Sequence, residues 1–168
     1  MPDRLDGTLE ERGSRTLLRF ERRLRQPPER VWQALTDLHE LRRWHPSPFE
    51  LDARVGGAVR YLPPGGVAMG EGKVLEYDPP RVLAYTWGDD ELRWEVRPDG
   101  DGSVLLLTHT FDDRFKGARD AAGWEVCLRR LEGALSGAEL EGGEWAELNR
   151  RYQEKFGISP EQATPPPS

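Results

Sequence analysis

Short alternations of hydrophobic and polar residues dominate the middle of the chain. Between residues 82 and 111, apolar side chains recur at every second position, and turns rich in glycine, proline and aspartate separate the stretches. This period is typical of strands with one buried face, and short turns join strands that are neighbours in an antiparallel sheet. We therefore predict one antiparallel sheet, with strands at residues 16–25, 48–52, 58–62, 70–77, 82–87, 92–97 and 103–111.

Two short helices are predicted after the first strand. Pro28 suits the first turn of a helix, and an apolar face at helical spacing follows it. Asp37, with Glu40 three residues later, fits a capping box that begins a second helix. Pro46 ends that helix, because proline cannot continue it.

A longer helical pattern follows the last predicted strand. Apolar side chains share one face of residues 120–135, and Trp145, Leu148 and Tyr152 share one face of residues 144–156. An apolar stripe gains free energy only when it is covered. We therefore predict that the sheet curves around the first of these helices and that the second packs back on the domain.

These elements predict an α+β fold: a curved antiparallel sheet wrapped around a long C-terminal helix, with two short helices after the first strand and one extra C-terminal helix. The length of 168 residues suits one domain with a substantial core. The predicted parts are a flexible N-terminus or added sheet edge at 1–15, the domain at 16–136, a docked helical extension at 137–158 and a disordered proline-rich tail at 159–168.

Composition limits the classes of partner and the cellular compartment that we expect. The net charge of −6 argues against nucleic acid, because binding phosphates requires a basic face. Arginines such as Arg22 alternate with glutamates on the first strand, and we expect them to be solvated. Cys127 is the single cysteine, the N-terminus lacks the apolar core of a signal peptide, and no apolar run is long enough to insert into a membrane. We expect a cytoplasmic protein.

Large aromatic side chains mark the face of the sheet that the pattern turns inward. Such residues offer apolar area and one directed hydrogen bond, which suits a pocket wall, but they suit a filled core equally well. Both interpretations stay open. The predicted ligand-binding residues are Tyr61, Tyr85, Trp87, Trp94, Leu107, His109, Trp124 and Leu128.

The histidines and the cysteine are the remaining candidates for chemistry. His109 shares a strand face with Leu107, so it is either a core histidine bonded to a neighbour or a polar anchor in a pocket. His45 follows a predicted helix end, where we expect it to be exposed. Cys127 lies on an apolar helix face and is predicted to be a buried, inert thiol. No histidine or cysteine spacing is typical of a metal site, and we predict no catalytic residue, metal or cofactor.

Five short motifs resemble one protein family. They are residues 28–32 (PERVW), 55–57 (VGG), 76–81 (EYDPPR), 85–87 (YTW) and 123–124 (GW). Together they resemble the START-like, helix-grip (SRPBCC) superfamily, in the bacterial branch related to the activator of the ninety-kilodalton heat-shock protein's ATPase. The resemblance covers about residues 15–135 and implies the helix-grip fold. It implies no single activity, because the superfamily includes lipid carriers, hormone binders, polyketide cyclases and co-chaperone domains.

Three functions fit these observations. The leading hypothesis is non-catalytic binding of a small hydrophobic, amphipathic or aromatic molecule between the sheet and residues 120–135. The second is a polyketide cyclase or aromatase that uses His109 or Tyr85 as an acid or base. The third is a chaperone-associated interaction domain or stress-response protein, which would need an exposed patch. The exposed edges of an open sheet also allow a homodimer.

Overall fold

A single antiparallel sheet forms the frame of the molecule in a computed structural model that describes residues 5–62, 71–138 and 142–165. Within these residues the sheet has eight strands in the order β1-β2-β8-β7-β6-β5-β4-β3. The strands are β1 (Thr8–Arg12), β2 (Arg15–Leu24), β3 (Phe49–Leu51), β4 (Ala58–Tyr61), β5 (Glu71–Asp78), β6 (Val82–Trp87), β7 (Asp90–Asp99) and β8 (Gly102–Phe111).

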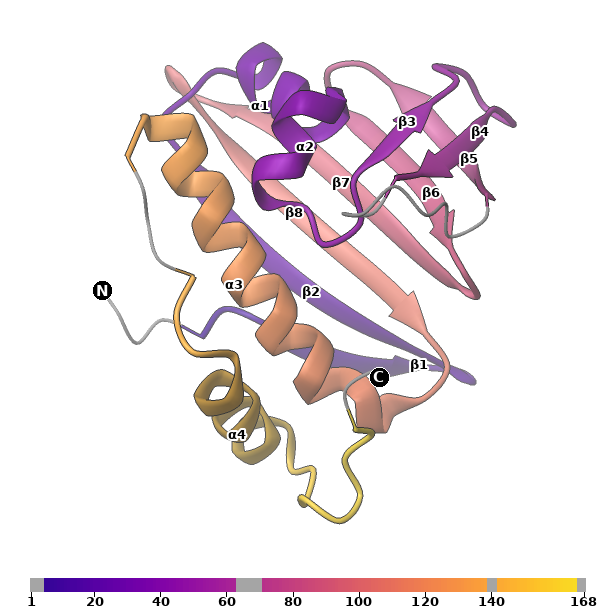
Figure 1. Ribbon diagram of the computed structural model, residues 1–168, viewed down its shortest axis with the longest axis vertical. Coiled ribbons are helices and arrows are strands. Elements are labelled where there is room, and N and C mark those ends of the chain that lie inside the picture. The colour runs from indigo at the N-terminus through magenta and orange to yellow at the C-terminus, as the bar shows by residue number, and fades with distance from the viewer. Residues whose placement is uncertain (1–4, 63–70, 139–141, 166–168) are drawn as a thin grey trace.

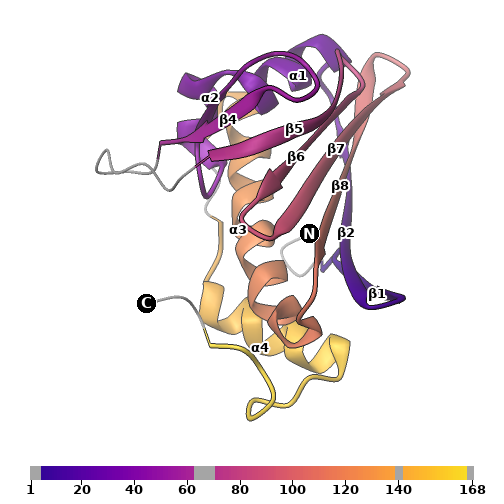
Figure 2. The same cartoon turned by 90° about the vertical axis from the view of Figure 1, so that its right-hand side faces the viewer.

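The helices lie on one side of this sheet. The short helices α1 (Pro28–Thr36) and α2 (Leu38–Trp44) cover one end, and the long helix α3 (Gly117–Ser136) runs diagonally across the same face (Figure 1). A 3-10 turn, η1 (Arg114–Lys116), joins β8 to α3, and α4 (Trp145–Phe156) packs against α3. The sheet bends around α3 (Figure 2). The predicted α+β helix-grip fold is confirmed.

Local sequence explains the helix boundaries. The Asp37 side chain accepts a hydrogen bond from the backbone of His39 at the start of α2, as an N-cap does. Gly137 ends α3 in the left-handed region, with φ of 72°, which a residue without a Cβ adopts at little cost. Helix α3 starts three residues before the predicted position 120, because η1 leads directly into it.

Segments near both ends of the chain contact the rest of the domain. Thr8–Arg12 pairs with β2, so the added-edge alternative describes this part of the N-terminus. Within the described part of the predicted tail, Thr164 donates its backbone N–H to Phe115 O over 3.1 Å and its hydroxyl to Asp113 Oδ2 over 2.6 Å. The disorder of residues 159–168 stays a prediction. The expectations for residues 1–4 and 166–168 lie outside the described residues.

A buried ion cluster corrects the prediction for Arg22. Its side chain points toward the helix side, is 4% exposed, and pairs with Glu125 of α3 at 2.5 Å. Tyr152 of α4 donates its hydroxyl to Glu125 over 2.7 Å and accepts the backbone N–H of Gly7 over 3.0 Å. A buried arginine needs such partners, because its charge cannot be left uncompensated away from water. The cluster therefore ties the N-terminal segment and α4 to the core.

Candidate functional site

A pocket of about 530 Å³ lies between the sheet and the N-terminal half of α3. Three tryptophans from different elements form its aromatic walls: Trp87 at the end of β6, Trp124 on α3 and Trp145 at the start of α4. The polar side of the pocket is formed by Asp90, His109, Lys116, Arg119 and Asp120. An aromatic surface thus faces a charged edge.

The hairpin from β6 to β7 places two of these residues together. Gly88 in its turn has φ of 61°, in the region that favours glycine. Trp87 is the strand partner of Asp90 across this turn. On the next strand, His109 pairs with Leu92, two residues beyond Asp90. Strand register alone therefore brings Trp87, Asp90 and His109 to one corner of the sheet.

His109 is buried, and both of its ring nitrogens are engaged. Trp124 Nε1 donates to His109 Nδ1 over 3.0 Å, and His109 Nε2 lies 2.8 Å from Asp90 Oδ2. An indole N–H can only donate, so Nδ1 is the nitrogen without a proton. We assign the hydrogen of the neutral ring to Nε2 from these partners, and His109 therefore donates to Asp90.

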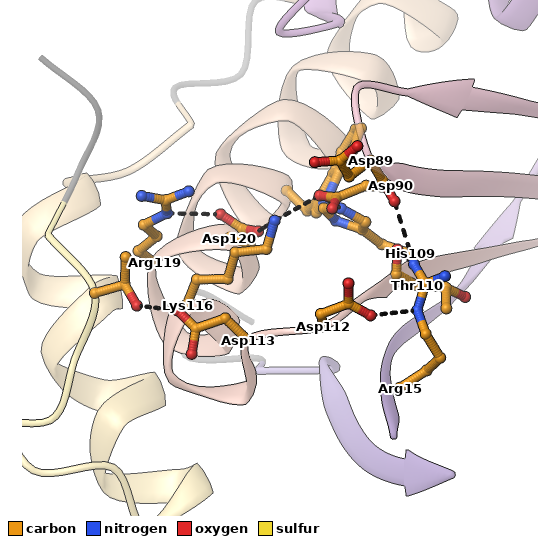
Figure 3. A network of polar contacts seen from close by, with 12 residues as sticks. Arg15, Asp89, Asp90, His109, Thr110, Asp112, Asp113, Lys116, Arg119 and Asp120 are labelled. Carbon is orange, nitrogen blue, oxygen red and sulfur yellow. Dashed lines mark hydrogen bonds and ion pairs between the residues drawn. The ribbon is translucent and has the colours of Figure 1, made fainter. Parts of the chain in front are cut away.

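Charged side chains from three elements meet beside His109 (Figure 3). Lys116 Nζ lies 2.6 Å from Asp90 Oδ2 and 3.8 Å from Asp120 Oδ2. Arg119 Nε donates to Asp120 Oδ1 over 3.0 Å. Burial by itself would raise the pKa of Asp90. The hydrogen bonds from His109 and Lys116 outweigh burial and lower that pKa below its ordinary value, so Asp90 is a carboxylate.

The donor atoms of Asp90, His109 and Asp120 lie within 4.8 Å of one another, close enough to suggest a metal site. Two observations argue against coordination. The Lys116 ammonium already lies between the two carboxylates. A metal would also need the lone pair of His109 Nε2, which carries the hydrogen as long as Trp124 donates to Nδ1. The geometry is that of a hydrogen-bond network.

Aromatic rings fill the other end of the space between the sheet and the helices. The ring centroids of Trp44 and Trp94 are 5.4 Å apart, and those of Phe49 and Tyr85 are 4.9 Å apart. Trp94 Nε1 donates to Tyr85 Oη over 3.1 Å, which satisfies both polar atoms away from water. This end is a packed core.

His45 belongs to this packed end, and the expectation that it is exposed was wrong. It does follow α2, but it is buried. Its Nδ1 accepts the backbone N–H of Ser47 over 2.9 Å, and its Nε2 lies 3.1 Å from Tyr85 Oη. Burial lowers the pKa of His45 to about 3, so the ring is neutral and Nε2 donates to Tyr85.

The predicted ligand-binding residues divide between the two ends. Trp87, His109 and Trp124 line the pocket. The other five lie in the packed core, where neighbouring side chains fill the space around them: Tyr61, Tyr85, Trp94, Leu107 and Leu128. Cys127 lies on the pocket wall, and burial raises the pKa of its thiol to about 12, as expected for an inert cysteine.

Sequence reasoning missed most of the polar side of the pocket. None of Asp90, Lys116 and Asp120 was named as a site residue from the sequence. No periodic signal singles out such residues. Trp145 was predicted to dock α4, and its indole does donate to Arg119 O over 3.3 Å. Its second position, on the pocket wall, depends on where α4 packs.

Comparison with protein families identifies the family of this chain. Residues 25–136 match the model described as Activator of Hsp90 ATPase homolog 1-like protein. The chain belongs to this family. The match covers α1 to α3, including every pocket residue except Trp145. The resemblance of the five motifs is thereby confirmed. Comparison with curated proteins gives no match.

Solved structures share the fold. A conserved protein of unknown function, EF2215 from Enterococcus faecalis, has a TM-score of 0.78 at 21% identity, with 91% of this chain and 92% of that chain covered. CalU16 from Micromonospora echinospora has a TM-score of 0.69 at 23% identity, with 90% and 94% covered. Protein MLL2253 from Mesorhizobium loti has a TM-score of 0.61 at 25% identity, with 74% and 99% covered. These similarities establish the architecture and leave the ligand to be argued from the pocket.

None of the described helices combines the length and the apolar composition needed to cross a membrane.

Proposed function

We propose that this protein binds a small amphipathic molecule in the pocket between the sheet and α3. The observation that carries the proposal is the division of the pocket into an aromatic side, formed by Trp87, Trp124 and Trp145, and a polar edge at Asp90 and Asp120. Small-molecule sites are typically concave and largely apolar, with a few placed polar groups that fix orientation. At about 530 Å³, the pocket has the size of such a site.

Binding explains the site better than acid–base catalysis does. A catalytic histidine needs a ring nitrogen within reach of the substrate, but both nitrogens of His109 are bonded to protein groups. Tyr85 lies in the packed core, and burial raises its pKa well above the usual value. The cyclase hypothesis named these two residues, and neither offers a free group to a substrate. The homodimer, the chaperone partner and the cytoplasmic location stay predictions.

Native mass spectrometry of the purified protein, followed by fluorescence titration with a panel of lipids and aromatic compounds, tests the proposal. We expect saturable quenching of tryptophan emission by at least one compound. Trp87→Phe should reduce the amplitude of that quenching, because it removes an emitter from the pocket. Trp32→Phe is the matched control, since Trp32 packs against Tyr77 and does not line the pocket.

A second variant separates pocket binding from binding elsewhere. Gly123 faces the pocket, and a Cβ at this position would lie 4.0 Å from Trp145 Nε1. Gly123→Leu should therefore fill part of the pocket and weaken binding. If no compound gives a saturable response, or if Gly123→Leu binds like the wild type, the proposal is wrong.

A further inference from the structure

Asp90 uses only one of its two carboxylate oxygens for the contacts that fix it. Oδ2 accepts from His109 Nε2 over 2.8 Å and from Lys116 Nζ over 2.6 Å. Among the described residues, no hydrogen bond or ion pair engages Oδ1, and Asp90 lines the pocket. A carboxylate accepts at about four lone-pair sites, so Oδ1 retains capacity for a ligand donor.

The ring nitrogens of His109 and two donors of Arg119 near Asp90 are committed to protein partners. Trp124 Nε1 donates to His109, which leaves no ring nitrogen of His109 for a ligand. Arg119 donates through Nε to Asp120 and through Nη1 to Pro165 O over 2.6 Å. The pocket therefore presents Asp90 Oδ1 as a fixed acceptor, beside the remaining donors of Lys116 Nζ and the acceptor Asp120 Oδ2.

The formal charges that line the pocket cancel. Asp90 and Asp120 contribute two negative charges, Lys116 and Arg119 contribute two positive charges, and His109 is neutral in the assigned tautomer. A charged ligand would lose its hydration without finding an uncompensated opposite charge, and that loss is costly in a partly buried site. A neutral donor such as a hydroxyl group loses much less hydration.

From this we infer the class of ligand: an uncharged, ring-bearing molecule whose hydroxyl group donates a hydrogen bond to Asp90 Oδ1. Its ring lies against the pocket tryptophans. His109 and Lys116 are positioning residues, because they hold the carboxylate through Oδ2 without contacting the ligand. This inference rests on the proposed function of the pocket.

Three naphthalenes with a neutral, an anionic and a cationic substituent at the same ring position test the inference by isothermal titration calorimetry at pH 7. The probes are 2-naphthol, naphthalene-2-sulfonate and (naphthalen-2-yl)methylammonium. We expect 2-naphthol to bind at least about tenfold more tightly than either ion. Asp90→Asn should weaken 2-naphthol about tenfold, because an amide oxygen is a weaker acceptor than a carboxylate. Asp89→Asn, the same change on the adjacent exposed side chain outside the pocket, should bind like the wild type.

A variant that changes which charged probe binds more tightly provides a test that does not depend on a loss of binding. Lys116→Met removes one positive charge and leaves the pocket with a net charge of −1. We expect this variant to bind the ammonium probe about tenfold more tightly than the wild type does, with the sulfonate weakened further. Circular dichroism confirms that each variant is folded before its affinity is compared.

The outcomes separate the two claims. Equal or tighter binding of the sulfonate, or 2-naphthol affinity that Asp90→Asn leaves unchanged, would overturn the hydroxyl inference while the pocket remains a binding site. Failure of all three probes would also overturn the inference. In that case the fluorescence panel decides whether the proposed function falls with it.

Discussion

The space between the sheet and the helices is filled at one end and open at the other, and Trp124 stands between the two ends. Its ring centroid lies 5.6 Å from that of Trp94 in the packed core and 5.8 Å from that of Trp87 on the pocket wall. Both ends are lined by aromatic residues that point inward from adjacent strands. Inward-facing aromatic residues therefore do not by themselves make a pocket.

The difference arises from what stands opposite the rings. At the packed end, Trp44 and His45 at the end of α2 pack on Trp94, and Phe49 of β3 packs on Tyr85. At the open end the charged side chains that line the pocket, Asp90, Lys116 and Asp120, are held to one another, and Gly123 supplies no side chain. The pocket lies where packing atoms are missing and polar groups satisfy one another.

The hydrogen bonds of the two buried histidines also differ between the packed end and the open end. Each accepts an N–H at Nδ1 and donates from Nε2 to an oxygen. His45 donates to the neutral hydroxyl of Tyr85, whereas His109 donates to the carboxylate of Asp90. The same tautomer thus stabilises a neutral core at one end and fixes a charged acceptor at the other.

The largest expected effect is on the free energy of unfolding, and it differs between a ring in the packed core and a ring on the pocket wall. Trp94→Ala should lower the free energy of unfolding by about 3–5 kcal/mol, the usual cost of removing a packed aromatic side chain. Trp87→Ala should cost about 1–2 kcal/mol, because the pocket already leaves part of that ring without packing partners. Urea unfolding at pH 7.5 measures both. Equal losses would mean that the two ends are equally packed.

Acid should destabilise the packed end through His45. Its pKa is about 3 in the folded protein and near the ordinary value of 6.5 when unfolded, so the unfolded chain binds more protons as the pH falls. The stability that depends on neutral His45 is complete above pH 6.5 and is lost progressively as the pH falls toward 3. Between pH 8 and pH 5 this loss is about 2 kcal/mol.

Substitution at His45 checks that slope. His45→Gln cannot titrate, so its unfolding free energy should fall about 2 kcal/mol less than that of the wild type between pH 8 and pH 5. His39→Gln is the matched control, because His39 is exposed on α2. A wild-type slope in His45→Gln would show that other groups control the acid response.

A smaller loss of stability is expected at Trp124, which lies between the packed core and the pocket. Trp124→Phe keeps a ring against Trp94 but removes the donor to His109 Nδ1, and we expect a loss of about 1 kcal/mol. Nitrogen-15 NMR of the imidazole should show the Nε2–H tautomer of His109 in the wild type and a mixture of tautomers in Trp124→Phe. A wild-type ring protonated at Nδ1 would contradict the assigned network.

The smallest change in stability is expected at Gly123. Here we expect stability to rise and the affinity for a pocket ligand to fall. Alanine in the middle of a helix is more favourable than glycine by about 0.5–1 kcal/mol, and the nearest atom beyond α3 is 4.0 Å from the added Cβ. Gly123→Ala should therefore raise the melting temperature slightly and weaken a pocket ligand. A lower melting temperature would show that this wall is already packed.

Much of the fold was predictable because its signals are local. The alternation from residue 82 to residue 111 predicted β6, β7 and β8 within a few residues, and the helical period predicted most of α3. Alternation along β2 puts Arg22 in phase with apolar residues. It could not show that Arg22 pairs with Glu125, 103 positions further along the chain. Such a pair becomes visible only when α3 lies across the sheet.

By itself, the sequence determined the α+β architecture and the inward face of the sheet, because periodicity and turn residues act over a few positions. Its five short motifs indicated the helix-grip family by resemblance. The tertiary structure alone decided which inward aromatic rings are packed and which line a pocket. It brought Asp90, Lys116 and Asp120 together from β7, η1 and α3, and it placed Trp145 of α4 beside Gly123. Charge pairing and packing depend on distances across elements, which no local pattern records.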